Sequence, residues 1–215
     1  MTLAPAPFRR PPDRRPPHFK LSVEQYHDMI ERGILPEGAP YELIDGMIVA
    51  KDRSAAGENP ITVGREHTWS VTALEELNAK FRRLGCYMRI QQPLTLPPYD
   101  EPEPDAALVP GTKDDYLDHH PVRGDLLCVV EVSDSSLDYD RSVKQQIYAD
   151  NDVPVYVIVN LPEGLVECYT DPIRGRRRYR NCVKLNPRQI LQLPAPRGKS
   201  VRVPVSQLLP QPRGS

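Results

Sequence analysis

The stretch LLCVVEV, residues 126–132, is a continuous run of apolar and β-branched residues interrupted only by Glu131. Such a run is typical of a strand that is covered on both faces. A helical pattern over residues 135–151 follows, and a second apolar run occupies residues 155–160. Strand, helix and strand in this order indicate a parallel crossover. The sequence therefore predicts an α/β fold with residues 126–132 at the centre of its sheet.

The chain before this strand is predicted to supply a helix, a hairpin and a longer helix. Residues 22–33 open with capping-box spacing and then repeat apolar side chains at helical intervals. Residues 41–49 are two β-rich runs around an Asp-Gly pair that suits a type I′ turn, and Glu42 lies on the first run. Apolar residues then recur at helical spacing over 63–84. This last segment is predicted to be the longest helix.

Shorter elements complete the prediction. We expect strands at 87–91 and 105–109, a pairing of 94–96 with the first of these, a terminal hairpin built from 166–169 and 177–183, and a short helix at 205–209. Nothing else in the proline-rich tail shows an organised pattern.

The prolines indicate where the domain begins and ends. Of 25 prolines in 215 residues, 12 lie in 1–20 and 186–215. Residues 1–20 also carry four arginines, a composition that cannot bury enough apolar surface to fold. We therefore predict a disordered basic arm at 1–20, a single domain at 21–210 and a disordered tail at 211–215. The arm could contact phosphate, but a solubilising leader is the favoured interpretation.

Cysteine usage and charge exclude several classes of protein. Cys86, Cys128, Cys168 and Cys182 form no C-x-x-C pair or zinc spacing, which is typical of free thiols in a reducing compartment. No apolar run is long enough for a signal sequence or a membrane span. The net charge of −1 excludes a protein that coats nucleic acid by bulk charge, although a local basic groove is compatible with it. A cytoplasmic protein is predicted.

Two carboxylates occupy positions where a charge is costly. Asp105 opens an apolar strand after a proline, and Glu131 interrupts the central one. A buried, ionised carboxylate needs a cation, a metal or strong hydrogen bonds, because otherwise its pKa rises until it is neutral. Mg²⁺ commonly binds one or two protein carboxylates and keeps its waters for substrate phosphates. Asp105 and Glu131 are therefore candidate ligands of Mg²⁺, for which Mn²⁺ could substitute.

Three further residues have both a functional and a structural interpretation. Lys144, on the helix after the central strand, could point back to the carboxylates and polarise water, or it could form an i, i+4 surface pair with Asp140. Glu42 could be a third acid or an exposed strand residue. His67 could bind a metal or titrate, but a lone histidine is more often a hydrogen-bonded helix residue, so we leave it out of the predicted site.

The interpretation of one charged segment stays open, and a second charged segment is interpreted as solvated. Arginines 174–180, among them Arg176, Arg177 and Arg178, could bind a phosphate backbone or form a solvated face, and neither interpretation is favoured. The acidic residues Asp100, Glu101 and Glu103 are interpreted as a solvated loop. Walker, G-x-G-x-x-G, G-x-S-x-G and H-E-x-x-H motifs do not occur, which removes the best-marked nucleotide-binding, hydrolase and zinc-protease classes.

Several motifs in order carry a family resemblance. They are Tyr41-Glu42-Leu43-Ile44-Asp45-Gly46, Gln92-Pro93, Pro104-Asp105, Val130-Glu131-Val132-Ser133, Asp140 through Lys144 to Tyr148, and Val155-Tyr156-Val157-Ile158-Val159. Over roughly residues 20–210 this order resembles the Uma family, a widespread bacterial family described as restriction endonucleases within the PD-(D/E)XK nuclease superfamily.

The resemblance implies a restriction-endonuclease-like mixed sheet flanked by helices, with an added N-terminal helix and hairpin. It implies Asp105 and Glu131 as metal ligands and Glu42 as a supporting acid. The superfamily lysine stands two residues after the second acid, where this chain has Ser133. Related families supply that lysine from the following helix, for which Lys144 is the matching residue. The resemblance and two-fold symmetry together suggest a homodimer.

Two functions follow as alternatives. The first is a Mg²⁺-dependent endonuclease that hydrolyses DNA through Asp105, Glu131 and Lys144. The second is a non-catalytic nuclease-fold module that binds nucleic acid through its arginines or serves in regulation or assembly. Neither alternative predicts a membrane partner.

Overall fold

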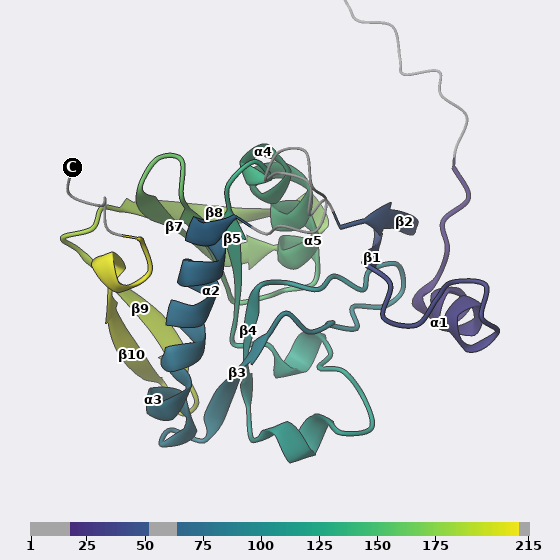
Figure 1. Ribbon diagram of the computed structural model, residues 1–215, viewed down its shortest axis with the longest axis horizontal. Helices are drawn as coiled ribbons and strands as arrows, with labels where there is room; N and C mark the ends of the chain where they lie inside the picture. The colour runs from purple at the N-terminus through teal and green to yellow at the C-terminus, as the bar shows by residue number, and fades with distance from the viewer. Residues whose placement is uncertain (1–17, 52–63, 211–215) are drawn as a thin grey trace, which may run out of the picture.

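A mixed six-stranded sheet forms the centre of the protein in the computed structural model, which describes residues 18–51 and 64–210 (Figure 1). Its strands follow the order β3-β4-β5-β6-β7-β8. They are β3 (Cys86–Ile90), β4 (Ala106–Pro110), β5 (Cys128–Ser133), β6 (Val155–Asn160), β7 (Leu165–Ile173) and β8 (Arg178–Leu185). β5 and β6 are parallel, and the other neighbouring pairs are antiparallel. The α/β prediction with a mixed sheet is confirmed.

The central strand is the apolar run that the sequence marked. All six residues of β5 are buried, as both faces of the strand are covered. The crossover from β5 to β6 consists of α4 (Leu137–Tyr139), a π-helical turn (Asp140–Lys144) and α5 (Gln145–Asp150). The predicted strand, helix and strand are therefore present, with a π-helical turn that the sequence did not indicate.

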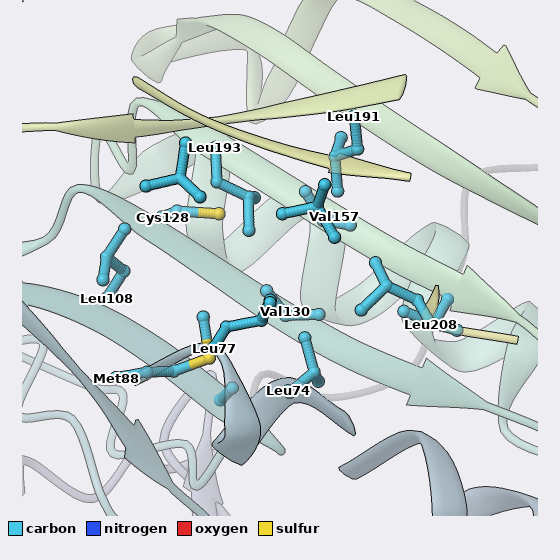
Figure 2. Close-up of a cluster of buried hydrophobic side chains, with 14 of the residues drawn as sticks. Leu74, Leu77, Met88, Leu108, Cys128, Val130, Val157, Leu191, Leu193 and Leu208 are labelled. Atoms are coloured by element: carbon cyan, nitrogen blue, oxygen red, sulfur yellow. The ribbon is translucent and has the colours of Figure 1, made fainter. Parts of the chain in front are cut away.

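One face of the sheet is covered by helices and by a second, two-stranded sheet. The helices are α2 (Arg65–Glu76) and α3 (Asn78–Arg82), and the small sheet pairs β9 (Ile190–Ala195) with β10 (Lys199–Pro204). Figure 2 shows Leu74, Leu191 and Leu193 converging on Val130 and Val157 of the main sheet. This cluster is the larger part of the hydrophobic core.

The single long helix predicted for 63–84 is wrong, because α2 and α3 are separate. The helices meet at Leu77, where ψ is −16°. Asn78 donates to the carbonyl of Met88 at 2.9 Å and accepts from its amide at 2.7 Å. These bonds fix the start of α3 to strand β3 at the break between the two helices.

Three other local predictions are wrong. The tail does not lack strands, because β9 and β10 alternate buried and exposed side chains. Their prolines are tolerated because a two-stranded sheet has two free edges. Residues 94–96 do not pair with β3, whose partner is β4; Thr95 instead bridges Val122. The helix predicted at 205–209 is a single 3-10 turn, Val205–Gln207.

The other face of the sheet carries α5 and the hairpin, and α1 packs on the hairpin. The hairpin pairs β1 (Tyr41–Ile44) with β2 (Met47–Ala50), and φ is positive at both turn residues, Asp45 and Gly46, as the predicted type I′ turn requires. α1 (Val23–Glu31) begins with the predicted capping box of Ser22 and Gln25. Both elements pack beside the segment that leads into β4 (Figure 1).

The predicted terminal arm and tail lie almost entirely outside the described residues, since 1–17 and 211–215 are not described. Within the part of the chain that the structure describes, no helix has the length and apolar character needed to cross a bilayer. The four cysteines are free thiols, and Cys86 and Cys128 are buried.

Candidate active site

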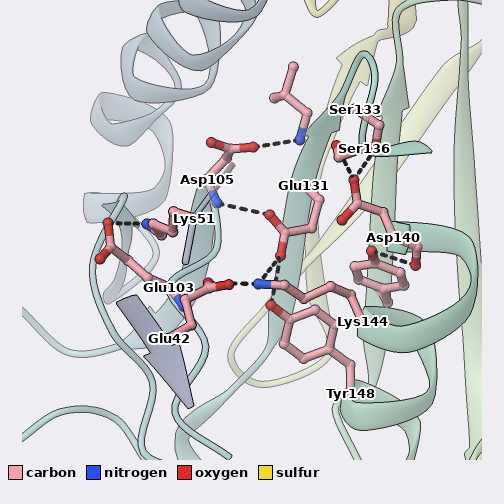
Figure 3. Close-up of polar contacts among 12 residues, drawn as sticks. Glu42, Lys51, Glu103, Asp105, Glu131, Ser133, Ser136, Asp140, Lys144 and Tyr148 are labelled. Carbon is pink, nitrogen blue, oxygen red and sulfur yellow. Dashed lines mark hydrogen bonds and ion pairs between the residues drawn. The ribbon is translucent and has the colours of Figure 1, made fainter. Parts of the chain in front are cut away.

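Asp105 and Glu131 lie side by side near the centre of the sheet. Asp105 immediately precedes β4, and Glu131 is the fourth residue of β5. The Asp105 amide donates to Glu131 Oε2 at 3.3 Å, and the Val132 amide donates to Asp105 Oδ2 at 2.8 Å. The antiparallel pairing of β4 and β5 therefore brings together the two carboxylates that the sequence selected (Figure 3).

Glu42 and Lys144 join this pair from two other segments. The Lys144 Nζ lies 2.7 Å from Glu42 Oε1 and 3.5 Å from Glu131 Oε1. Glu42, Glu131 and Lys144 are all buried, with exposed residue fractions of 4% to 6%. Glu42 also accepts from the Glu103 amide at 2.7 Å. Neither structural alternative, the exposed glutamate or the Asp140–Lys144 surface pair, describes these residues.

Lys144 is the last residue of the π-helical turn Asp140–Lys144. A π turn contains one more residue than an α turn between hydrogen-bonded groups, so it changes the direction of the side chains that follow. Asp140 and Lys144 are the two buried residues of the turn. Such turns are frequent at functional sites.

Asp140 is held by two serines rather than by Lys144. Its Oδ2 accepts from the hydroxyls of Ser133 and Ser136, each at 2.7 Å. The family resemblance implies a lysine at the position of Ser133. Ser133 instead donates a hydrogen bond to the buried Asp140, and the Lys144 Nζ lies 3.5 Å from Glu131 Oε1.

Tyr148 and Lys51 make further polar contacts in Figure 3. The Tyr148 hydroxyl, fully buried, donates to Glu131 Oε1 at 2.8 Å. Lys51 forms an ion pair with Glu103. The sequence predicts no role for Lys51 or Tyr148. The apolar neighbours of Tyr148 indicated burial and no function, and Lys51 follows β2 at a position that no sequence pattern distinguishes.

The acidic segment 100–103 is not a solvated loop, and that prediction is wrong. Glu101 is buried and accepts from Thr95 at 3.0 Å and pairs with His27 at 2.8 Å. Asp100 accepts from the Asp45 amide at 2.6 Å. These carboxylates form contacts with α1 and the hairpin. A run of neighbouring acids in the sequence does not predict such contacts.

His67, left out of the predicted site, points at Asp105. Its Nε2 lies 3.1 Å from Asp105 Oδ1 and 3.2 Å from Oδ2. His67 is in the first turn of α2, one and two turns before Val71 and Leu74, which pack on the sheet. This shared helical face is the sequence signal that would have placed His67 toward the sheet.

The site residues line one cavity of about 480 Å³. Six carboxylates contribute to its wall, namely Glu42, Glu103, Asp105, Glu131, Asp134 and Asp140, together with Lys51, Lys144 and His67. The cavity therefore holds more acids than bases. An added cation would be attracted to it.

The two central acids have opposite electrostatic environments. Burial raises the pKa of Glu131 to about 8, against the opposing effect of Lys144. Burial would raise the pKa of Asp105, but the hydrogen bond and charge of His67, together with hydrogen bonds from Val132 and Gln91, lower it below its usual value. Burial would lower the pKa of Lys144, yet Glu131 and Glu42 raise it above its usual value. Lys144 is accordingly a fixed cation.

The donor set fits a hard divalent ion held by few protein ligands. Among the described residues, no three His, Cys, Asp or Glu side chains form a ready-made metal cage. Mg²⁺ does not require one, because it usually takes one or two carboxylates and retains water. Asp105 and Glu131 provide adjacent carboxylates in an acid-rich cavity. These ligand types suit Mg²⁺, although the described residues alone do not supply a complete coordination shell.

The arginine hairpin lies away from this cavity. Glu131 aligns with Ile158 and, one strand further, with Glu167. Arg178 pairs with Ile173, six residues beyond Glu167, which corresponds to about 20 Å along the strand. The structure therefore does not bring Arg176, Arg177 and Arg178 together with the predicted catalytic residues.

Comparisons with known proteins agree with this fold. A family model described as "Uma2: Putative restriction endonuclease" matches residues 23–204. The crystal structure of a putative nuclease belonging to DUF820 from Anabaena variabilis ATCC 29413 is similar to the chain, with a TM-score of 0.60 and 13% sequence identity. The match covers 87% of this chain and 97% of that one. No curated protein matches the chain.

Proposed function

The chain belongs to the Uma2 family, described as restriction endonucleases, and on this basis we propose that it hydrolyses phosphodiester bonds of DNA with the help of Mg²⁺. One observation carries the proposal: Glu42, Asp105, Glu131 and Lys144, from four separate segments, line one cavity. A nuclease family implies a nucleic acid as substrate. DNA hydrolysis and metal dependence are the parts that we add.

Asp105 and Glu131 are the residues that would hold the ion. When bound, the ion would supply positive charge that stabilises the charge developing on the scissile phosphate. The Val132 amide fixes one oxygen of Asp105, and Tyr148 fixes one oxygen of Glu131. These contacts keep the carboxylates in place before a cation arrives, so little reorganisation is required.

Lys144 contributes a second, permanent positive charge. Its ammonium is paired with Glu42 and so remains charged inside a buried site. A charged ammonium cannot accept a proton, so we assign Lys144 to binding a phosphate oxygen or orienting the attacking water. Glu42 is then a positioning residue, because it acts through Lys144.

Cleavage of plasmid and single-stranded DNA, each with Mg²⁺ or Mn²⁺, tests the proposal. Asp105→Asn, Glu131→Gln and Lys144→Met should each reduce cleavage by at least about a hundredfold, the scale associated with losing one transition-state contact. Asp114→Asn changes an exposed acid outside the cavity and should cleave like the unaltered protein. Circular dichroism would establish that each variant is folded.

Cleavage that persists in folded Asp105→Asn and Glu131→Gln would refute the metal site. A folded protein that binds DNA in a salt-dependent way and cleaves none of these substrates would instead favour the non-catalytic module, with the exposed arginine hairpin as the binding surface.

A further inference from the structure

Tyr139 places a hydroxyl group in the wall of the cavity that holds Asp105 and Glu131. It is the last residue of α4 and directly precedes the π-helical turn that ends at Lys144. Its half-buried ring packs against the apolar cluster that includes Ile147 of α5. The hydroxyl oxygen is buried and has no hydrogen-bond partner among the described residues. A buried hydroxyl without a partner costs free energy, so this group requires an explanation.

The acids around the Tyr139 hydroxyl form hydrogen bonds with other groups. Glu42, Asp140 and Glu131 are near enough to influence the hydroxyl electrostatically. Glu42 accepts from Lys144, and Asp140 accepts from two serine hydroxyls. Glu131 accepts from a tyrosine of α5. Within the described part of the chain, the Tyr139 hydroxyl therefore lies in the cavity but outside the network that holds these acids.

The Tyr139 hydroxyl is a hydrogen-bond donor at neutral pH. Burial raises the pKa of Tyr139 to about 12, against the opposing effect of the nearby Lys144 ammonium. The hydroxyl consequently keeps its proton at neutral pH. An O–H group that faces a cavity pairs best with an acceptor that enters the cavity.

A phosphodiester is an acceptor that needs such a donor here. Six carboxylates line the cavity and repel the anionic oxygens of a nucleic acid. The ammonium groups of Lys51 and Lys144 are each paired with a glutamate. Tyr139 supplies a donor that no acid of the described residues occupies.

We infer that the Tyr139 hydroxyl donates a hydrogen bond to a non-bridging phosphate oxygen of the nucleic acid, so that Tyr139 contacts the substrate directly. This inference rests on the proposed function and adds a substrate contact to the same site. A hydrogen bond to an ionised phosphate oxygen is stronger than one to a neutral acceptor. A water molecule is the alternative acceptor, and the experiment separates the two.

Tyr139→Phe tests the inference because it removes the hydroxyl and keeps the ring. Fluorescence anisotropy of labelled duplex and single-stranded DNA, with Ca²⁺ in place of Mg²⁺, measures binding separately from cleavage. The variant should bind DNA about tenfold or more weakly, the effect of losing a hydrogen bond to a charged group. Its cleavage with Mg²⁺ should fall by at least the same factor. Its urea midpoint should not decrease, because the folded protein loses no hydrogen bond between described residues.

Tyr116→Phe is the matched control. Tyr116 is also half-buried, and burial likewise raises its pKa to about 12. Its hydroxyl, however, lies outside the cavity and donates to the Pro110 carbonyl at 3.2 Å. Tyr116→Phe should therefore lower the urea midpoint and leave DNA binding and cleavage unchanged.

The failure of this inference differs from the failure of the proposed function. If the unaltered protein and Tyr139→Phe bind DNA equally well, the hydroxyl does not contact the phosphate and pairs with water. If Tyr139→Phe has a lowered urea midpoint, the hydroxyl stabilises the fold and the inference is equally refuted. If the unaltered protein neither binds nor cleaves DNA, the proposed function fails and the inference fails with it.

Discussion

Replacing Lys144 by methionine should destabilise the metal-free protein through a loss of charge compensation. Methionine retains an unbranched apolar chain and removes only the ammonium group. That group is within 2.7 Å of Glu42 Oε1 and 3.5 Å of Glu131 Oε1, and Lys144 is 4% exposed. The substitution leaves two buried carboxyl groups without their cation.

The expected loss in the free energy of unfolding follows from these distances. With an effective dielectric constant of about 20, the two attractions amount to about 6 and about 5 kcal/mol. Most of this lost attraction is offset. The variant has no buried ammonium, whose desolvation costs several kcal/mol, and its carboxyl groups can take up protons. Removing one partner of a buried pair typically lowers the free energy of unfolding by about 3–5 kcal/mol, and we expect a value in this range.

A double-mutant cycle with Glu42→Gln isolates the Lys144–Glu42 contact. Urea unfolding near neutral pH, with a chelator present, would give the free energies of unfolding for the two single variants and the double variant. The double variant should be more stable than the sum of the single effects predicts, by about 2 kcal/mol. Single effects that add within about 0.5 kcal/mol would refute the pairing on which the site depends.

Three further outcomes are expected. Burial would raise the pKa of Glu167, but hydrogen bonds, foremost those from Arg141, lower it. The ionised Glu167 therefore stabilises the fold at pH values above the ordinary glutamate pKa. This stabilisation is lost as the pH falls through the lowered pKa of Glu167. Glu167→Gln should cost about 3 kcal/mol at neutral pH and much less in acid, and equal losses in denaturant melts at both pH values would contradict this. Tyr148→Phe removes the hydrogen bond to Glu131 and should cost about 1–2 kcal/mol in the same assay; no loss would show that the bond contributes nothing. Phe81→Ala, at a fully buried position, should lower the free energy of unfolding by about 3–5 kcal/mol, and a loss below about 1 kcal/mol would contradict tight packing under α3.

The sheet centre and its two acids were predictable because their signals are local. The apolar run of β5 requires cover on both faces, and an acid within such a run requires compensation. The positions of Asp105 and Glu131 could therefore be selected from their immediate neighbours. Their roles in metal binding stay predictions.

The partners of those acids were less predictable because they are remote in the chain. Lys144 and Glu42 are 102 residues apart, and nothing near Glu42 distinguishes a buried strand acid from an exposed one. The burial of Glu101 likewise depends on contacts with α1. Sequence patterns report periodicity within an element and not which elements meet.

The attachment of hairpin β1–β2 determines how easily this part of the protein opens locally. It is not part of the six-stranded sheet, and it is attached beside the segment before β4 through the bridge between Leu43 and Glu101. Local opening of such a unit needs less free energy than unfolding of a central strand. In hydrogen exchange, the amides of Leu43 and Glu101 should therefore exchange before those of β5, and each opening would separate Glu42 from Lys144 while the central sheet stays folded.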